Sequence, residues 1–550
     1  MNSLASSQKN TFYGGAAVLT ISALVIKVMG AIYRIPLGNI LSDAVMGDYN
    51  SAYNIYSVLL TISTAGLPVA VSKSISEASA LNRRNQVMKI FQVALNTFLV
   101  LGVLGFLCMT VLAIPVSNIL LKDPKAVYCV LALSPSVLCV CLMSPIRGYF
   151  QGQMNMWPTG ISQIIEAFFK LIVGLILAFY FVNVAKLDEL GSVGAIIGVS
   201  VGSAVALAYL VYVFIGARRQ ERTRPAQDKP DDGRKVFSTL LKLAVPITIG
   251  SAATSLVSLL DGNLVMDLLT DIYHNVDGLA LDATTGLGPA LDAARTQYGI
   301  YSKTWPLYNL PFSMMVPLTA SIVPAVTACV SKRDRAGARR ISESAVRMGM
   351  IVALPMCMGL FALGGPIMSL LYPSIDSDVA GPLLSLLALA AVFVSIQLLC
   401  NAILQANNMV NLPVLVVIVG GVVKIIVNYI LVGNPAIRVY GAPVGTICCF
   451  AVIALAEMYI IRRAIPAAPR FGRAISKPLV ASVIMAACAW AVHGLLAGPL
   501  KLSSRVAVLP AIAIAVLVYL ALVLALHAIS KEDLSLMPKG DKIAKILRIR

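Results

Sequence analysis

Residues 380–402 read AGPLLSLLALAAVFVSIQLLCNA, a run that carries no charged side chain. A bilayer core about 30 Å thick needs about 20 apolar residues in a helix, so this run is long enough to cross a membrane. Strict alternation of apolar and polar residues, the mark of membrane barrel strands, is missing. The run therefore predicts a transmembrane helix.

Comparable runs recur along the whole chain. Of its 550 residues 58% are hydrophobic and 12% are charged, and the mean hydropathy is +0.85, which excludes a string of soluble domains. We predict an all-α integral membrane protein of about 14 transmembrane helices. Their approximate limits are 11–36, 50–72, 90–115, 127–146, 158–182, 192–217, 239–269, 299–328, 342–366, 380–402, 412–433, 440–463, 477–498 and 506–529.

The net charge of +18, from 43 basic and 25 acidic residues, raises the question of a nucleic-acid partner. With the N-terminus inside, thirty of the Lys and Arg residues fall on inner segments and eight on outer ones. Cytoplasmic loops retain Lys and Arg, so both termini are predicted to be cytoplasmic. The surplus then contacts anionic membrane lipids, and no nucleic-acid partner is expected.

Several chemistries are excluded by residue spacing. The three histidines stand alone, without the paired spacing of a zinc site, and no GxxxxGK[ST] phosphate loop occurs. The ten cysteines lie in apolar runs, where thiols normally serve as packing residues. The N-terminus has no small-residue cleavage site, so a removed signal peptide is not expected. We predict no cofactor, although a coupling monovalent cation is compatible with the sequence.

Residues of the first half recur in the second half. Six spans separate the copies, and because six is even the two halves have the same orientation. Parallel repeats around a central cavity are typical of transporters, whose site lies near the midplane. The matches are Tyr49 with Tyr298, Pro68 with Pro317 and Ser72 with Ser321 at one offset, and Gln151 with Gln405 and Lys170 with Lys424 at another.

The repeat predicts two parallel six-helix lobes with a C-terminal appendage. The expected parts are a first lobe at 1–217, a basic cytoplasmic linker at 218–238, a second lobe at 239–463, two appended helices at 464–529, and a basic tail at 530–550.

Charged residues embedded in the predicted spans are the candidate site, because an ionisable group in a bilayer costs at least about 2.5–3.5 kcal/mol and normally faces a cavity. Lys27 and Arg34 are seven residues apart, which places them on one helical face about 10 Å apart. Two such cations suit an anion with two negative groups, such as a pyrophosphate. Alternatively, Arg34 snorkels to the outer interface.

The other embedded residues have alternative interpretations. Arg147 anchors a helix end at the cytoplasmic edge or takes part in a gate. Glu166 and Lys170, spaced i, i+4, neutralise each other as an intrahelical pair or share in a gate or coupling site. Lys424 has no carboxylate at the equivalent position, which makes it a cavity candidate. Asp261 has three interpretations: it neutralises Lys27 or Arg34 while the cavity is empty, it carries a coupling cation, or it forms a buried salt bridge that holds the lobes together.

Residues 9–77, KNTFYGGAAVLTISALVIKVMGAIYRIPLGNILSDAVMGDYNSAYNIYSVLLTISTAGLPVAVSKSISE, resemble the opening of stage V sporulation protein B-like polysaccharide-biosynthesis membrane proteins. SPIRGYFQGQMNMWPTGISQIIE (144–166) and PLYNLPFSMMVPLTASIVPAV (306–326) fit the same group. It belongs to the MOP exporter superfamily, which joins multidrug and toxin extruders (MATE), oligosaccharidyl-lipid flippases and MurJ. The resemblance implies two six-helix lobes, alternating access, no enzymatic chemistry and a monomer in the bacterial plasma membrane.

The resemblance also implies a cargo, an undecaprenyl-linked saccharide moved from the inner to the outer leaflet. The motif K-V-M-G puts Lys27 at the cavity position of the MurJ branch. That branch has basic residues in spans 2 and 8, where this chain has ISTAG and Trp305-Pro306, and Lys303 is the candidate to supply the missing charge. The two appended helices are expected to hold the lipid tail.

We therefore expect a flippase for a polyprenyl-pyrophosphate-linked saccharide such as lipid II or a related cell-wall, spore-cortex or polysaccharide precursor. A cation-coupled multidrug extruder of the same superfamily is the alternative. A membrane polysaccharide ligase or acyltransferase is a remote one, because the long outer segment 270–298 has His274 and several aspartates but no catalytic motif.

Overall fold

The computed structural model describes residues 22, 25–26, 28–30, 32–64, 66–115, 117, 126–221, 228–281, 288–331, 333–407, 409, 411–465, 468–498 and 503–528, and these ranges contain helices and no strands. Their contacts divide the chain into two compact units, Met1–Gly299 and Ile300–Arg550. The all-α prediction is confirmed. The predicted tail at 530–550 and the side chain of Lys27 lie outside the described residues.

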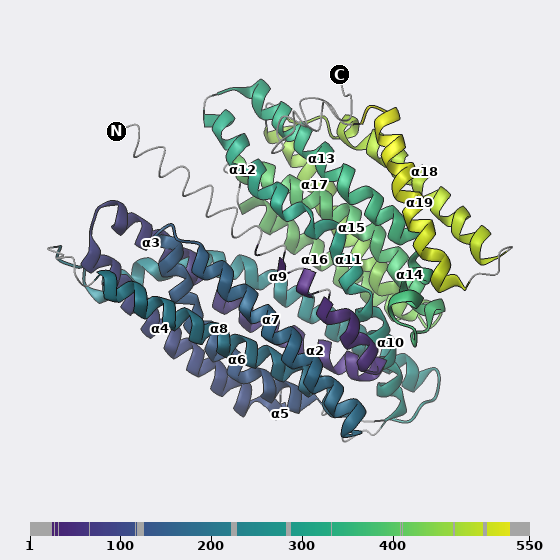
Figure 1. Ribbon diagram of the computed structural model, residues 1–550, viewed down its shortest axis with the longest axis horizontal. Helices are drawn as coiled ribbons and strands as arrows, with labels where there is room; N and C mark the ends of the chain where they lie inside the picture. The colour runs from purple at the N-terminus through teal and green to yellow at the C-terminus, as the bar shows by residue number, and fades with distance from the viewer. Residues whose placement is uncertain are drawn as a thin grey trace. The chain divides into compact units, whose positions relative to one another are not determined.

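The helices of the first unit follow one another along the chain (Figure 1). The long helices α4, α6, α7 and α8 are packed together in this unit. The bounds are α2 Asp43–Thr64, α3 Gly66–Ala80, α4 Arg84–Val111, α5 Ala113–Pro115, α6 Val127–Gly152, α7 Trp157–Phe179, the π-helix η3 Tyr180–Val184, the 3-10 helix η4 Asp188–Leu190, α8 Gly191–Glu221, α9 Gly233–Asn275 and α10 Pro289–Lys303, which ends in the second unit.

The second unit is built in the same way from helices. Its α15 packs on α12, α13, α14 and α17, while α18 packs on α13 and α19. The bounds are α11 Trp305–Ser313, α12 Met315–Ser331, α13 Arg335–Ala362, α14 Gly364–Leu371, α15 Ser377–Ala406, α16 Asn411–Val432, the 3-10 helix η5 Arg438–Tyr440, α17 Gly441–Ala464, α18 Phe471–Ala497 and α19 Ser504–Ala525.

Ten helices in the described ranges are long and apolar enough to cross a membrane. The chain is therefore a multi-pass membrane protein. The other four predicted spans fall on 11–36, on α2 and α3, on α9 and on α10 to α12, so the predicted count of fourteen stays a prediction.

The span predicted at 299–328 is divided among α10, α11 and α12, with the turn residues Thr304 and Met314 between these helices. The span predicted at 50–72 falls on α2 and α3, and residue 65 between them lies outside the described residues.

The contact-based division places α9 in the first unit, because α9 packs on α2, α3 and α4. The predicted lobe boundaries at 217 and 239 were drawn from the sequence repeat, which a division by contacts does not test, so they stay a prediction. Within the long outer segment predicted at 270–298, α9 continues to Asn275 and α10 begins at Pro289.

The interface between α7 and α8 has almost no side-chain layer. A Cβ at Gly198 would meet the backbone of Gly174, and a Cβ at Gly202 would lie 2.5 Å from the carbonyl oxygen of Glu166. Glycines four residues apart allow two membrane helices to approach this closely. The contact fixes the part of α7 that carries the candidate site.

The predicted linker is bound to the start of α4. Asp228 accepts hydrogen bonds of 2.9 Å from the backbone N–H groups of Asn85 and Gln86, and Arg83 donates to the carbonyl oxygen of Lys229 at 2.9 Å. Arg83 also forms an ion pair of 3.2 Å with Asp231. Because α4 has no side-chain cap of its own, the linker supplies the acceptor for its first free N–H groups.

Candidate functional site

Predicted site residues meet on one face of α7. Ser162, Glu166 and Lys170 follow each other at intervals of four residues, so their side chains share that face. Arg147 of α6 donates from Nε to Ser162 Oγ at 3.1 Å and from Nη2 to Glu166 Oε2 at 3.0 Å. Ser203 of α8 donates to the other carboxylate oxygen at 3.2 Å. Glu166 is therefore bound by both neighbouring helices.

The pairing differs from the intrahelical pair that the i, i+4 spacing suggested. The charged partner of Glu166 is Arg147, and Lys170 turns to aromatic rings instead. The planar guanidinium of Arg147 has several N–H donors in fixed directions, so it binds the Ser162 hydroxyl and the Glu166 carboxylate at the same time. The ammonium group of a lysine is a compact point charge and is less suited to such double binding. The side chains of Arg147 and Glu166 are 13% and 25% exposed, so the pair is half-buried. The predicted gating role of this pair stays a prediction.

Lys170 lies against tyrosine rings. Its Nζ is 4.8 Å from the ring centroid of Tyr53 and 5.2 Å from that of Tyr33, and it donates a hydrogen bond of 3.4 Å to the Tyr53 hydroxyl. Tyr33 donates to the carbonyl oxygen of Ala195 at 3.0 Å, which fixes its ring on α8. Tyr49 stacks on Tyr53 with ring centroids 5.8 Å apart. Tyr33, Tyr49 and Tyr53 are called the tyrosine cage below.

The tyrosine cage was not predicted from the sequence, although the spacing of tyrosines on α2 was a signal for part of it. Tyr49, Tyr53 and Tyr56 recur at i, i+4 and i+7, the spacing of one helical face, and all three lie on α2. Buried tyrosines are most often packing residues. The Lys170 ammonium group, which lies over the rings of Tyr33 and Tyr53, distinguishes this cluster from ordinary core tyrosines, and that contact is visible only in three dimensions.

Arg34 adds a second cation at the tyrosine cage. It follows Tyr33 in the helical segment 32–40, is half-buried, and lies close enough to interact electrostatically with Lys170 and Tyr53. Among the described residues, no carboxylate oxygen lies within 4.0 Å of Lys170 Nζ. The predicted pair of cations Lys27 and Arg34 stays a prediction, since Lys27 lies outside the described residues.

Asp261 lies on α9 and is buried. The next residue, Gly262, faces both the hydroxyl of Tyr298 on α10 and the amide of Asn54 on α2, at 2.9 and 3.0 Å from a Cβ placed on the glycine. Asn54 itself donates to the Tyr298 hydroxyl at 3.2 Å. Asp261 is therefore next to the contact between α2 and α10, while its predicted coupling role stays a prediction.

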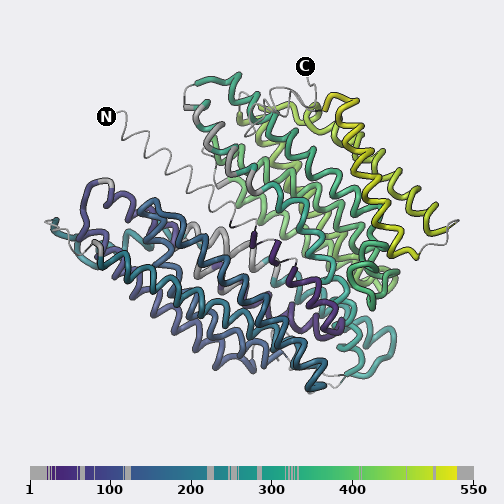
Figure 2. Tube along the Cα trace, in the orientation of Figure 1, coloured from purple at the N-terminus to yellow at the C-terminus, as the bar shows by residue number. Residues whose placement is uncertain are grey.

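At two glycines, the backbones of α2 and α10 are in direct contact, with no side chain between them. A Cβ at Gly47 would lie 2.9 Å from the carbonyl oxygen of Arg295, and a Cβ at Gly299 would collide with the carbonyl oxygen of Asp43. Arg295 Nε forms an ion pair of 3.1 Å with Asp48. These five residues are called the α2–α10 seam, whose helices lie side by side in Figure 2.

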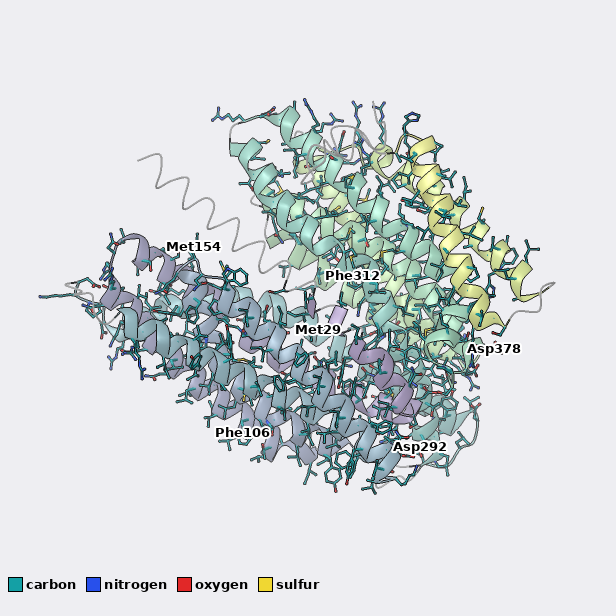
Figure 3. The ribbon with its side chains drawn as sticks, in the orientation of Figure 1. Met29, Phe106, Met154, Asp292, Phe312 and Asp378 are labelled. Atoms are coloured by element: carbon teal, nitrogen blue, oxygen red, sulfur yellow. The ribbon has the colours of Figure 1, made fainter. Side chains whose placement is uncertain are left out.

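Arg295 has a second acidic neighbour in the first turn of α10. Its Nη1 donates to Asp292 at 3.1 Å, and Figure 3 labels Asp292 in that turn. Asp48 and Arg295 were not among the predicted site residues. Asp48 precedes the second predicted span and Arg295 was assigned to an outer loop, so neither was counted as embedded.

The predicted site residues of the second unit are placed differently from each other. Lys303 is 2% exposed, and its Nζ is 5.7 Å from the ring centroid of Tyr372. Lys424 of α16 is half-buried, one turn before Asn428, which is fully buried against Gly445 of α17. Lys303 is closed off from solvent in this conformation, and Lys424 is the more accessible of the two cations. The cavity role of both stays a prediction.

One embedded carboxylate of the second unit was missed. Glu457 lies within α17 and has no exposed surface. The sequence signal was available, because Glu457 is the only acidic residue of the apolar span predicted at 440–463.

The fold belongs to a known class of membrane transporters. The lipid II flippase MurJ in an inward closed conformation matches with a TM-score of 0.68 and 15% identity, over 92% of this chain and 98% of that chain. An inward-facing multidrug resistance MATE family transporter matches with a TM-score of 0.63 and 14% identity, over 82% and 98%. The chain is a membrane transporter of the MOP superfamily, as predicted.

Family models agree with the fold. The model of the polysaccharide biosynthesis protein family matches residues 12–330, and the MatE model matches residues 297–430. The first match covers more than half of the chain, so the chain belongs to the polysaccharide biosynthesis protein family.

Curated relatives occur in Bacillus subtilis strain 168. The uncharacterized membrane protein YabM is 26% identical over 548 residues, which cover 99% of this chain and 98% of the relative. Stage V sporulation protein B is 23% identical and covers 83% of this chain and 85% of its own length. The lipid II flippase MurJ is 23% identical and covers 76% and 77%.

Proposed function

We propose that this protein is a flippase that moves a polyprenyl-pyrophosphate-linked saccharide from the inner to the outer leaflet by alternating access. The observation that carries the proposal is Lys170, held by the tyrosine cage beside Arg34. A cation–π contact contributes about 0.5–2 kcal/mol, less than the cost of embedding a lysine in a membrane span. An anionic ligand would supply the missing counter-charge.

The chemistry of the tyrosine cage fits both parts of such a ligand. A pyrophosphate spreads its charge over two phosphoryl groups, and it can bind an ammonium and a guanidinium at once. Tyrosine rings offer apolar faces for a sugar and hydroxyls for its polar groups. The relative named lipid II flippase supports a cargo of this class, which includes cell-wall and spore-cortex precursors.

A cation-coupled multidrug extruder is the second candidate, because the MatE model matches residues 297–430. An organic cation needs an available carboxylate, and Glu166 already has the Arg147 guanidinium and the Ser203 hydroxyl on its oxygens. Lys170 has no carboxylate within 4.0 Å among the described residues, and this favours an anionic cargo.

We further propose how the protein lies in the membrane. Both termini are cytoplasmic, the basic loops contact anionic lipids, and the chain works as a monomer in the bacterial plasma membrane. The α2–α10 seam is then closed toward the outside in this conformation, and the cargo leaves when it opens. The appended helices α18 and α19 hold the polyprenyl tail.

Transport by purified protein in liposomes tests the proposal directly. Wild-type protein should flip a labelled polyprenyl-pyrophosphate saccharide, Lys170→Met should lose this activity, and Lys242→Met, an exposed lysine on α9, should keep it. Export of an organic cation such as ethidium, without movement of any lipid-linked saccharide, would show the extruder instead.

Rescue of a strain depleted of its lipid II flippase then separates the cargoes. Growth, with the accumulated lipid precursors falling to normal, indicates general peptidoglycan export. Normal growth but defective spores in a strain that lacks this protein indicates a spore-cortex precursor.

A further inference from the structure

Glu457 is a carboxylic acid enclosed by an apolar core. It has no exposed surface, and both of its side-chain oxygens are buried without a hydrogen-bond partner. On α17 the residues one turn before and after it, Ile453, Ala454 and Ile461, are also buried. Glu457 thus lies on the face of α17 that packs into the second unit.

Among the described residues, the helices around that face offer no counter-charge to Glu457. α15 presents the thiol of Cys400, which is itself fully buried and interacts electrostatically with Glu457. On α16 the only charged residue is Lys424, whose carbonyl oxygen is near Gly445, three turns along α17 from Glu457. α12, which packs in the same core, has Cys329 as its only ionisable residue.

Two further helices contribute to that core, α13 and α18, and their charges are engaged elsewhere or lie beyond ion-pair distance. Glu343 accepts from Arg339 at 3.0 Å and from the backbone of Arg470 at 2.9 Å. No cationic nitrogen of the described residues, Arg347 of α13 included, lies within 4.0 Å of the Glu457 carboxyl group.

An ionised carboxylate in such a place is strongly disfavoured, because neither water nor a cation compensates its lost hydration. The group therefore carries a proton in this conformation. Even a neutral acid group is costly when its polar atoms are unpaired. A buried polar group without partners is rare in folded proteins and calls for a functional explanation.

We propose that Glu457 is a proton-binding site that couples transport to the proton gradient. The carboxyl group is protonated while α15 and α17 enclose it. When these helices separate and water enters, the O–H bond breaks, the proton passes to water and the carboxylate keeps the electron pair. Binding in one conformation and release in the other link the conformational equilibrium to pH. The inference rests on the alternating access in the proposed function, but not on the identity of the cargo.

Infrared spectroscopy of the full-length protein in liposomes tests the bound proton. At neutral pH the wild type should show the carbonyl stretch of a buried protonated carboxylic acid, and Glu457→Gln should lack that band. Glu343→Gln is the matched control, since Glu343 is ion-paired, and it should keep the band. Identical spectra for the wild type and Glu457→Gln overturn the proposal.

The coupling itself is tested by distances between spin labels, one placed in each unit, measured as a function of pH without cargo. The populations of the wild type should shift with pH, whereas Glu457→Gln should stay in the low-pH distribution at every pH. Glu457→Met, which is apolar and of similar length, serves if the glutamine variant does not fold. A wild-type pH response in both variants rules out coupling through Glu457. If the protein responds to pH but does not flip a lipid-linked saccharide, the proposed proton site is supported and the proposed cargo is wrong.

Discussion

Arg295 Nε on α10 lies 3.1 Å from the Asp48 carboxylate on α2, and the two side chains are 2% and 7% exposed. One residue further on α2, Tyr49 is the predicted repeat counterpart of Tyr298 on α10, which accepts a hydrogen bond from Asn54. The two helices that the predicted repeat relates are in direct contact in the first unit, through an ion pair, a hydrogen bond and two glycines. Packed interfaces tend to switch between discrete arrangements rather than deform continuously, which is the property that a gate needs.

The two halves of this ion pair should respond unequally to substitution. Arg295→Met leaves the buried Asp48 carboxylate without its cation, a change that typically costs about 3–5 kcal/mol. Asp48→Asn leaves Arg295 paired with Asp292 at 3.1 Å, so its cost should be smaller. The midpoint of thermal unfolding in detergent should therefore fall further for Arg295→Met. Equal losses would mean that Asp292 gives Arg295 no support.

The glycines of the α2–α10 seam should control its closure. In Gly299→Ala the new methyl group meets the rigid carbonyl group of Asp43, so α2 and α10 must move apart. Overpacking of this kind costs about 1–3 kcal/mol, which shifts a two-state equilibrium by about 5- to 150-fold. Disulfide cross-linking between Asn54→Cys and Tyr298→Cys should drop accordingly.

The control for the seam is Gly216→Ala on α8. A Cβ at Gly216 meets no atom within 4 Å, so this variant should cross-link as well as the parent. A Gly299→Ala protein with unchanged cross-linking would show that the seam is looser than its backbone contacts indicate.

The sequence predicted the fold class, because the apolar runs and the charge distribution are properties of single segments. It predicted that Glu166 and Lys170 share a face of one helix, which needs only the helical period. It did not predict their partners, since Arg147 and Tyr53 reach that face from other helices. Glu457 could have been found by the same scan for embedded charges, but its lack of partners depends on three-dimensional packing.

Segment boundaries were less predictable where polar residues form helices. Residues 289–298 contain one aspartate and one arginine and were assigned to an outer loop. They form the first part of α10, in which Arg295 is buried by its contact with Asp48. A helix whose charged residue is satisfied by a distant segment has no signature in local hydropathy.

Lys170 should matter for its charge and Tyr53 mainly for its ring. Lys170→Met removes the ammonium group that would contact the anionic cargo, and a hydrogen bond to a charged group is worth about 1.5–3 kcal/mol, or about 10- to 100-fold in apparent affinity. Tyr53→Phe keeps the ring beneath Lys170 Nζ and should have a smaller effect. Competition of unlabelled against labelled lipid-linked saccharide measures both. A larger loss in Tyr53→Phe would shift the binding role to its hydroxyl.

The linker should detach from α4 in acid. Burial of the Asp228 carboxyl group opposes its charge, but the N–H groups of Asn85 and Gln86 outweigh this and hold its pKa below the ordinary value of 3.8. Because the pKa is lowered by folding, the stabilisation is present above pH 3.8 and is lost as the pH falls through the folded-state pKa. Amide hydrogen exchange of Asn85 and Gln86, corrected for its intrinsic pH dependence, should show that loss. Asp228→Asn should weaken protection at every pH, whereas Asp232→Asn should behave like the wild type.

Arg147 and Glu166 should show strong energetic coupling, because each is the charged partner of the other at 3.0 Å in a half-buried position. Arg147→Met leaves a carboxylate with only the Ser203 hydroxyl, and Glu166→Met leaves a guanidinium with the Ser162 hydroxyl. The double variant removes both charges, so its loss of stability should be smaller than the sum of the single losses by about 0.5–3 kcal/mol. Thermal unfolding of the four proteins measures this coupling energy.

The same four proteins separate a structural pair from a gate. If the pair only holds α6 to α7, the double variant should recover flipping together with stability, because no unpaired charge remains. If the pair opens and closes during transport, stability should recover while flipping stays impaired. Additive losses of stability would show that Ser162 and Ser203 satisfy the two charges independently, and would exclude both roles for the ion pair.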